Sequence, residues 1–354
     1  MKKILLSVMA LVLAWGCKKD KPTDTQNGNF PSTGHLLYVA NEGAYGNGNA
    51  SLTLINIDND SVYQDIYRTA NRKATGDVLQ SVAVVGDEIF LAVNNSNKLL
   101  VIDKATAALK TSIDIPQPRY MAVGNEKIYI SSLYHKEIFV INTQTKSVTD
   151  TIELDHNNTE GLTLYNGKLY ACNWDTACNY VYEIDTANAS IVRRIGIGGY
   201  APQQAVADKN GNLWVMAGNV YQGETATLSC LNLANGTISK YFELPAGTDM
   251  MKPCMNPAAD TIYYLGVNYD GGTQNNGVFR MDINATQPPD APFIQAGALQ
   301  YFWGLGIDPA TGWIYVADPK GFVQLGSLDV YQTNGSLIKS YNTGVGPGFL
   351  LFRQ

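Results

Sequence analysis

The sequence is poor in charge and in the residues that many enzyme centres use. Only 16% of its 354 residues are charged, the net charge is −6, and the three histidines lie far apart at His35, His135 and His156. No basic stripe follows residue 21. This excludes a nucleic-acid surface, which needs clustered Lys and Arg. No GxSxG, HExxH or phosphate-loop motif is present, so the sequence favours a protein that is not an enzyme.

Cysteine is also scarce, and its spacing is not that of a metal site. Four cysteines follow Cys17, and no CxxC pair occurs among Cys172, Cys178, Cys230 and Cys254. We therefore predict neither a metal site nor a cofactor. Cys172 and Cys178 flank NWDTA and would face each other across a hairpin loop; an exported chain permits their pairing, which stays open.

The N-terminal segment predicts export and lipid attachment. Lys2 and Lys3 precede an apolar run over residues 4–13, which is too short to span a bilayer and fits a signal peptide. Gly16 before Cys17 resembles a lipobox, so we expect residues 1–16 to be removed and Cys17 to be acylated. Ordinary secretory cleavage is the alternative. Residues 17–34 would form a flexible tether to the membrane.

The rest of the chain repeats one phrase seven times. An aromatic residue anchors an apolar segment before each loop, and an apolar-Asp or apolar-Asn step follows the loop, as in Ile102-Asp103. The period of roughly 40 to 50 residues is typical of propeller blades. The aromatic series is Tyr38, Phe90, Tyr129, Tyr170, Trp214, Tyr263 and Tyr315.

Within each unit the apolar pattern has the period of strands. Residues 120–124, 127–132, 137–142 and 148–154 predict four strands joined by short turns, and no segment predicts a helix of several turns. We predict an all-β fold over residues 35–354, a seven-bladed β-propeller of four-stranded antiparallel blades. The first blade lacks an inner strand, and residues 347–352 supply it, so the C-terminal strand closes the ring.

The loops between second and third strands share one face with the blade-to-blade connections, because strands of a meander alternate in direction. These loops are long and varied, and binding residues usually lie on such loops. Their Tyr, Trp, Asn and Gln residues suit a large, mostly neutral ligand with apolar faces and amide edges. An aromatic residue there can instead be only a lid on the blade core. The predicted ligand-binding residues are Tyr45, Gln80, Asn94, Arg119, Tyr134, Trp174, Asp175, Tyr221, Tyr269, Trp303 and Lys320.

Several stretches resemble a known family over the whole mature length. LYVANEGAYGNGNASL, GDVLQSV, PRYM and GLGIDPATGWIYVADPKG are similar to the YncE-like (YVTN-type) seven-bladed propellers, and more narrowly to the BtuG-like surface lipoproteins of gut Bacteroidetes. This resemblance implies a lipid-anchored, surface-exposed protein of the outer membrane. It would capture cobalamin (vitamin B12), a corrinoid, and pass it to a TonB-dependent transporter. The corrinoid is then a transported ligand rather than a catalytic cofactor.

Three other functions remain open from the sequence. Related propeller lipoproteins are associated with ferric siderophores. A multiply anionic siderophore requires a cluster of Lys and Arg side chains that point at it. On the predicted face acidic residues outnumber basic ones. A surface platform for a protein or glycan partner would show a flat face rather than an axial funnel. A propeller lyase would need a metal or a His-Glu pair on the axis. Retention in the inner leaflet is the alternative to surface display.

Overall fold

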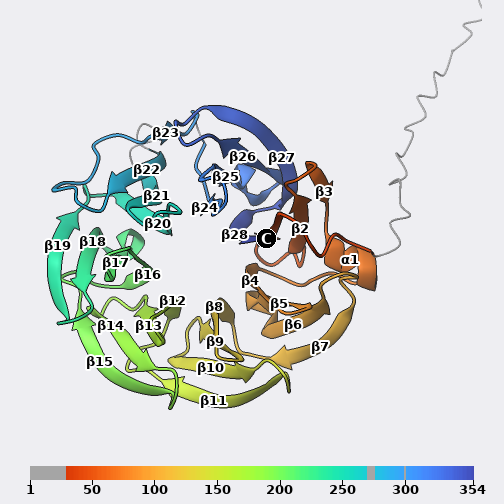
Figure 1. Ribbon diagram of the computed structural model, residues 1–354, viewed down its shortest axis with the longest axis horizontal. Helices are drawn as coiled ribbons and strands as arrows, with labels where there is room; N and C mark the ends of the chain where they lie inside the picture. The colour runs from red at the N-terminus through yellow and green to blue at the C-terminus, as the bar shows by residue number, and fades with distance from the viewer. Residues whose placement is uncertain (1–28, 269–275, 299) are drawn as a thin grey trace, which may run out of the picture.

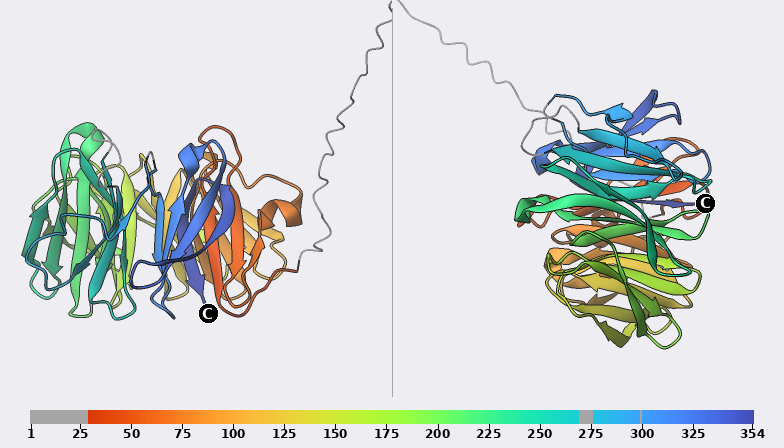
Figure 2. Two further views of the ribbon diagram at one scale, coloured as in Figure 1. Left: turned by 90° about the horizontal axis from the view of Figure 1, so that it is seen from above. Right: turned by 90° about the vertical axis from the view of Figure 1, so that its left-hand side faces the viewer.

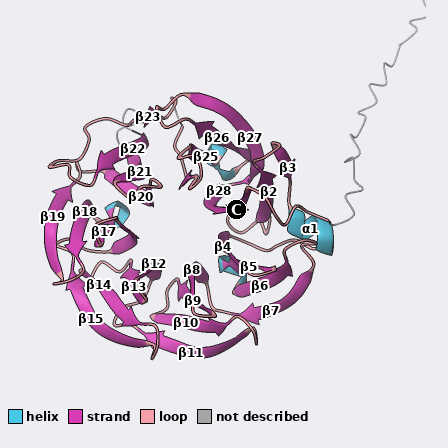
Figure 3. Cartoon of the chain, in the orientation of Figure 1, coloured by secondary structure: helices cyan, strands magenta, loops and turns pink. Residues whose placement is uncertain are grey.

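The computed structural model describes residues 29–268, 276–298 and 300–354, and these form a ring of seven four-stranded antiparallel sheets. Figure 1 shows the sheets arranged as blades around a central axis, and Figure 2 shows their strands running between the two faces of the ring. The predicted seven-bladed propeller is confirmed. Helix is confined to short segments, as Figure 3 shows.

Each blade has an inner, a second, a third and an outer strand. In ring order from the first blade, the inner strands are β28 (Pro347–Arg353), β4 (Leu79–Val85), β8 (Pro118–Gly124), β12 (Thr159–Tyr165), β16 (Pro202–Ala207), β20 (Thr248–Met255) and β24 (Gly304–Ile307). In the same order, the second strands are β1 (Leu36–Asn41), β5 (Glu88–Val93), β9 (Lys127–Ser132), β13 (Lys168–Asn173), β17 (Asn212–Asn219), β21 (Thr261–Asn268) and β25 (Ile314–Asp318).

The third and outer strands complete the blades. The third strands are β2 (Ser51–Asn56), β6 (Lys98–Asp103), β10 (Glu137–Asn142), β14 (Tyr180–Asp185), β18 (Glu224–Asn232), β22 (Gly277–Asp282) and β26 (Leu325–Tyr331). The outer strands are β3 (Ser61–Tyr63), β7 (Leu109–Asp114), β11 (Ser147–Glu153), β15 (Ser190–Gly196), β19 (Thr237–Glu243), β23 (Ile294–Gln295) and β27 (Leu337–Val345). The short helices are α1 (Ile66–Asn71), η1 (Asn94–Ser96), η2 (Val220–Gln222) and η3 (Lys320–Phe322).

The ring is closed by the C-terminal strand, as predicted. β28 pairs with β1 from Leu36↔Arg353 to Asn41↔Pro347, so the last strand of the chain is the inner strand of the first blade. This pairing joins residues from opposite ends of the sequence and removes a free sheet edge.

The core lies between blades. The buried apolar residues form seven clusters among the described residues, one for each pair of neighbouring blades. All seven aromatic anchors of the repeat are buried in these clusters. Because each sheet is covered on both faces, second strands such as β1 and β5 carry nearly continuous apolar runs, LLYVA and IFLAV.

The repeated Asp or Asn has a structural role in the turn between third and outer strands. In six blades its side-chain oxygen accepts a hydrogen bond from the backbone N–H two residues later, which is an Asx turn. The six residues are Asn56, Asp103, Asn142, Asp185, Asn232 and Asp282. The repeated Asp or Asn therefore stabilises turns, and these turns lie on the face opposite to the predicted binding face.

No helix in the described residues is long and apolar enough to cross a membrane.

Candidate functional site

The inner strands begin with a repeated backbone distortion on the predicted binding face. The residue before the strand has a left-handed φ, and in five blades its carbonyl accepts a hydrogen bond of 2.8–3.1 Å from the N–H at the end of the second strand. A positive φ is unusual for a β-branched residue such as Val78 and is retained only where the surroundings enforce it. The five residues are Val78, Gln117, Asn158, Ala201 and Gly346.

A β-bulge follows in most inner strands and re-aims side chains toward the axis. The register shifts between Leu79 and Ser81, for example, and leaves Gln80 unpaired between them. A bulge has this effect because one extra residue kinks the strand and breaks the in–out alternation. The residues at the shifts are Gln80, Arg119, Tyr120, Glu160, Gly161, Gln203, Lys252, Pro253 and Gly348.

Six of these residues line a cavity at the centre of the ring, to which all seven blades contribute. Counted up to its open mouth and including the solvent there, the space in the cavity is about 640 Å³. Its lining residues are Glu42, Gln80, Arg119, Tyr120, Glu160, Trp174, Gln203, Gln204, Asp249, Met251, Lys252 and Trp303.

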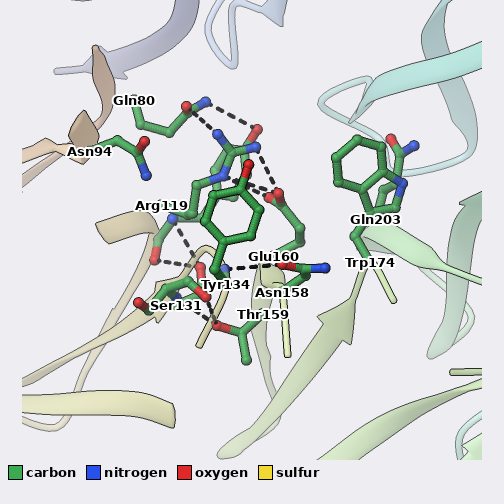
Figure 4. A network of polar contacts seen from close by, with 12 residues as sticks. Gln80, Asn94, Arg119, Ser131, Tyr134, Asn158, Thr159, Glu160, Trp174 and Gln203 are labelled. Atoms are coloured by element: carbon green, nitrogen blue, oxygen red, sulfur yellow. Dashed lines mark hydrogen bonds and ion pairs between the residues drawn. The ribbon is translucent and has the colours of Figure 1, made fainter. Parts of the chain in front are cut away.

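Arg119 is the centre of a buried polar network on one wall. Its Nε and Nη2 donate to Glu160 Oε1 at 3.0 and 2.7 Å, and its Nη1 donates to Gln80 Oε1 at 2.6 Å. Figure 4 shows the three side chains meeting, with Trp174 and Gln203 across from them. Only 18% of the Arg119 side chain and 4% of the Glu160 side chain are exposed. The guanidinium is therefore already neutralised and held in place.

Next to this network, two aromatic rings of the cavity lie beside one lysine. The Lys252 Nζ lies 5.8 Å from the centroid of Tyr120 and 5.9 Å from that of Trp303, a cation–π arrangement with both rings. The Trp303 indole N–H donates to Glu42 Oε1 at 2.9 Å. Gly348 permits this contact, because a Cβ there would lie 2.4 Å from the same oxygen.

Trp174 and Gln203 share one acceptor. The Trp174 indole N–H and the Gln203 amide donate to the Gly218 carbonyl at 2.8 and 2.9 Å. These two hydrogen bonds hold the Trp174 ring and the Gln203 amide side by side on the cavity wall. The face of the Trp174 ring and the oxygen of the Gln203 amide can then contact a ligand.

Two carboxyl groups of the cavity have shifted proton affinities. Burial raises the pKa of Asp249 from 3.8 to about 6, and the Met250 N–H, which donates to Asp249 Oδ1 at 2.8 Å, offsets this only in part. Burial also raises the pKa of Glu160, against the opposing influence of Arg119. Asp249 is thus a carboxyl that changes charge near neutral pH at the cavity wall.

The structure brings four of the predicted residues together at this cavity: Gln80, Arg119, Trp174 and Trp303. Tyr45, Tyr134 and Tyr221 instead project from loops of the same face, with 80%, 66% and 98% of their surface exposed. None of the three lines the cavity, and Tyr134 borders a separate surface hollow with Gln117 and His135.

The other predicted residues are placed elsewhere. Asn94 is buried and donates to the Pro118 carbonyl at 3.2 Å, which links the second and third blades. The Asp175 carboxylate accepts a hydrogen bond of 2.9 Å from the Ala177 N–H and so stabilises its own loop. Lys320 borders a separate surface hollow with Asp318 and Tyr301. Tyr269 lies outside the described residues.

The sequence reading missed part of the cavity. The lining residues that were not among the predicted site residues are Glu42, Tyr120, Glu160, Gln203, Gln204, Asp249, Met251 and Lys252. Lys252 has a left-handed backbone conformation (φ 55°), and no local sequence pattern predicts this conformation. A useful signal was the polar residue at the second position of five inner strands, since the starts of these strands converge on the axis.

The cysteines and metal ligands give no competing site. Cys172, Cys178 and Cys230 are buried free thiols, and Cys254 is partly buried and free. The described residues contain no group of three or more His, Cys, Asp or Glu side chains placed to hold a metal ion.

Solved structures with this architecture have diverse functions. A quinoprotein alcohol dehydrogenase-like protein from Bacteroides thetaiotaomicron is 15% identical, with a TM-score of 0.66 over 92% of this chain and 79% of its own. Hydrazine synthase from Kuenenia stuttgartiensis is 15% identical, with a TM-score of 0.62 over 75% of this chain and 86% of its own. Apo AztD from Citrobacter koseri is 11% identical, with a TM-score of 0.58 over 90% and 98%. At these identities the similarity shows the fold alone.

A sequence family profile covers nearly the whole propeller. It is described as a domain of unknown function (DUF5074) and matches residues 35–349. None of the curated proteins matches the sequence.

Proposed function

The chain belongs to the DUF5074 family of domains of unknown function, and we propose that it is a binding protein that captures a corrinoid at the central cavity. The observation that carries the proposal is the convergence of all seven blades on one cavity lined by Trp174, Trp303 and Tyr120 together with glutamine amides. Aromatic faces suit the apolar macrocycle, and amides suit its amide fringe.

The size of the cavity defines the expected pose. A corrinoid is larger than 640 Å³, so part of it would enter the cavity while the macrocycle rests on the rim. The exposed rings of Tyr45, Tyr134 and Tyr221 lie on loops of that face and are available to it. Such rigid aromatic residues provide contact area at a low cost in side-chain entropy.

The charges in the cavity favour a ligand without several negative charges. Arg119 is neutralised by Glu160, and Lys252 is the other base among the described lining residues, beside Glu42 and Asp249. A multiply anionic ferric siderophore would meet more acids than bases there. The proposal is binding rather than catalysis, since the described lining residues include no His, Cys or Ser.

The proposal extends to the place of capture. The signal segment and Cys17 support a lipid anchor, and the resemblance to surface lipoproteins supports display on the outer membrane. There the protein would hand its ligand to a TonB-dependent transporter. Radiolabelled palmitate incorporation that is lost in Cys17→Ser would test the anchor separately from ligand binding.

The direct test is binding of cyanocobalamin to the protein without residues 1–28. We expect a red protein peak after desalting, and calorimetry gives the Kd. Trp303→Phe shrinks one aromatic face of the cavity and removes the indole N–H that holds this ring against Glu42, and the lost contact area and fixed position should weaken binding about 5- to 10-fold. Trp313→Phe is the matched control, because Trp313 follows the turn between β24 and β25 on the opposite face.

A colourless peak would reject the corrinoid. Ferric siderophores would then be titrated, followed by protein and glycan partners. Equal weakening by Trp303→Phe and Trp313→Phe would place the binding surface away from the cavity even if cobalamin binds.

A further inference from the structure

A second cavity opens at the side of the sixth blade, away from the central axis. Counted up to its mouth and including the solvent there, its space is about 750 Å³, and it lies between the end of β19 with the β19–β20 connection, β21, β22 and the segment that follows β22. In Figure 1 this segment, residues 283–293, swings outward toward β19 before it returns as β23.

The sequence of this segment explains why a cavity forms there. The segment INATQPPDAPF contains three prolines, which lack the N–H that a ladder needs. The outer strand is therefore reduced to the two residues of β23, Ile294–Gln295. The chain passes outside the blade instead, and Pro288 and Pro289 form the outer wall of the cavity.

Both ends of the segment are tied down, so the cavity is a fixed feature of the fold. At its start, Lys240 Nζ donates to the carbonyls of Ile283 and Ala285 at 2.8 and 2.7 Å. At its end, the Phe293 N–H donates to the Val278 carbonyl at 2.7 Å.

The floor of the cavity is a stacked aromatic pair. Tyr264 and Phe279 are direct cross-strand partners, and their rings lie 5.3 Å apart at an interplanar angle of 6°. Gly266 makes room for this arrangement, because a Cβ there would lie 2.4 Å from the Phe279 ring. Together with Pro288 and Pro289, these rings give the cavity an apolar, partly aromatic lining, which favours an aromatic guest.

Two observations define the polar part of a ligand. Tyr264 is only 2% exposed, and its hydroxyl has no hydrogen-bond partner among the described residues, so a bound group can satisfy it. Two carboxylates, Glu243 and Asp290, stand at the exposed edge, and the described lining contains no basic residue. This charge favours a cation at the mouth.

We propose that this lateral cavity binds an aromatic ammonium compound. The ring lies against the Tyr264–Phe279 floor, and the ammonium group lies at the mouth between Glu243 and Asp290. The site is independent of the central cavity and of the ligand proposed for it.

The test is calorimetric titration of the propeller with tryptamine, compared with indole-3-propionate, which has the same ring but a carboxylate. Tryptamine should bind with a Kd in the millimolar range or tighter, and at least tenfold more tightly than the anion. The double variant Glu243→Gln/Asp290→Asn should remove about tenfold of tryptamine affinity, since two partly exposed ion pairs are lost. Both substitutions lie at exposed positions, so the fold is kept.

Trp303→Phe, in the central cavity, is the control and should leave tryptamine binding unchanged. Equal affinity for tryptamine and indole-3-propionate would overturn the proposal, as would an absence of tryptamine binding at millimolar concentration. Loss of tryptamine binding in Trp303→Phe would reassign the site to the central cavity.

Discussion

The buried ion pair at the central cavity allows a quantitative test of what holds the inner ring together. Arg119 on β8 and Glu160 on β12 belong to neighbouring blades, and three hydrogen bonds of 2.7–3.2 Å connect them. Glu160→Gln keeps the size of the side chain and removes its charge, which leaves a buried guanidinium without a counter-ion. Breaking a buried pair in this way costs about 3–5 kcal/mol.

The expected change in melting temperature follows from the size of the propeller. Unfolding entropy is about 2.1 cal/mol/K per residue, so roughly 320 residues give about 0.7 kcal/mol/K. A loss of about 3–5 kcal/mol therefore lowers the Tm by about 4–7 °C. Differential scanning calorimetry at pH 7 measures this shift directly.

Two further variants separate charge burial from a general effect of substitution. Arg119→Met/Glu160→Leu replaces the pair with apolar groups of similar volume and should recover most of the lost Tm. Glu153→Gln breaks the exposed pair with Lys136 and should leave the Tm unchanged. A Tm for Glu160→Gln within about 1 °C of the unaltered protein would show that this ion pair is not shielded from water and does not stabilise the fold.

Three other predictions follow from buried groups. For Asp249, the raised pKa of about 6 means that its favourable contribution is complete below pH 4 and is lost as the pH rises through 6. Asp249→Asn should therefore raise the unfolding free energy by about 3 kcal/mol at pH 7 and by nothing at pH 3.5, measured by denaturant titration. Gly161→Ala should cost about 1–3 kcal/mol, because its Cβ would lie 2.7 Å from the Gln203 carbonyl oxygen; Gly196→Ala, with open space around it, should not. Burial raises the pKa of the Cys178 thiol to about 11, so Ellman's reagent should label it only after denaturation; rapid labelling of the native protein would contradict this.

The fold was predictable because its information is local and repeated. Alternation of apolar residues defines each strand, and the period between the aromatic anchors defines the blade. The Asp or Asn at the end of six third strands defines a turn, because its side-chain oxygen accepts a hydrogen bond from the backbone N–H two residues later, as Asp185 does from Ala187. Ring closure was predictable too, since the first blade lacked an inner strand and the last residues supplied one.

The site was predictable only at the level of a face. Gln80, Arg119, Trp174 and Trp303 line the cavity, and all four lie in blade connections, at strand starts or in loops of the predicted face. The equally aromatic Tyr221 lies on the same face but is 98% exposed. Sequence composition could not separate these two groups, because the distance of a loop residue from the axis depends on how far its loop extends above the ring.

The sequence by itself determined the strands, their number, the closure of the ring and the face on which polar and aromatic residues gather, since these depend on periodicity and turn chemistry. Only the tertiary structure decided which side chains meet. Left-handed residues and bulges turn Gln80, Arg119 and Lys252 toward the axis. The Arg119–Glu160 pair and the lateral cavity likewise join residues from different strands or segments, and their contacts exist only once the blades are packed against each other.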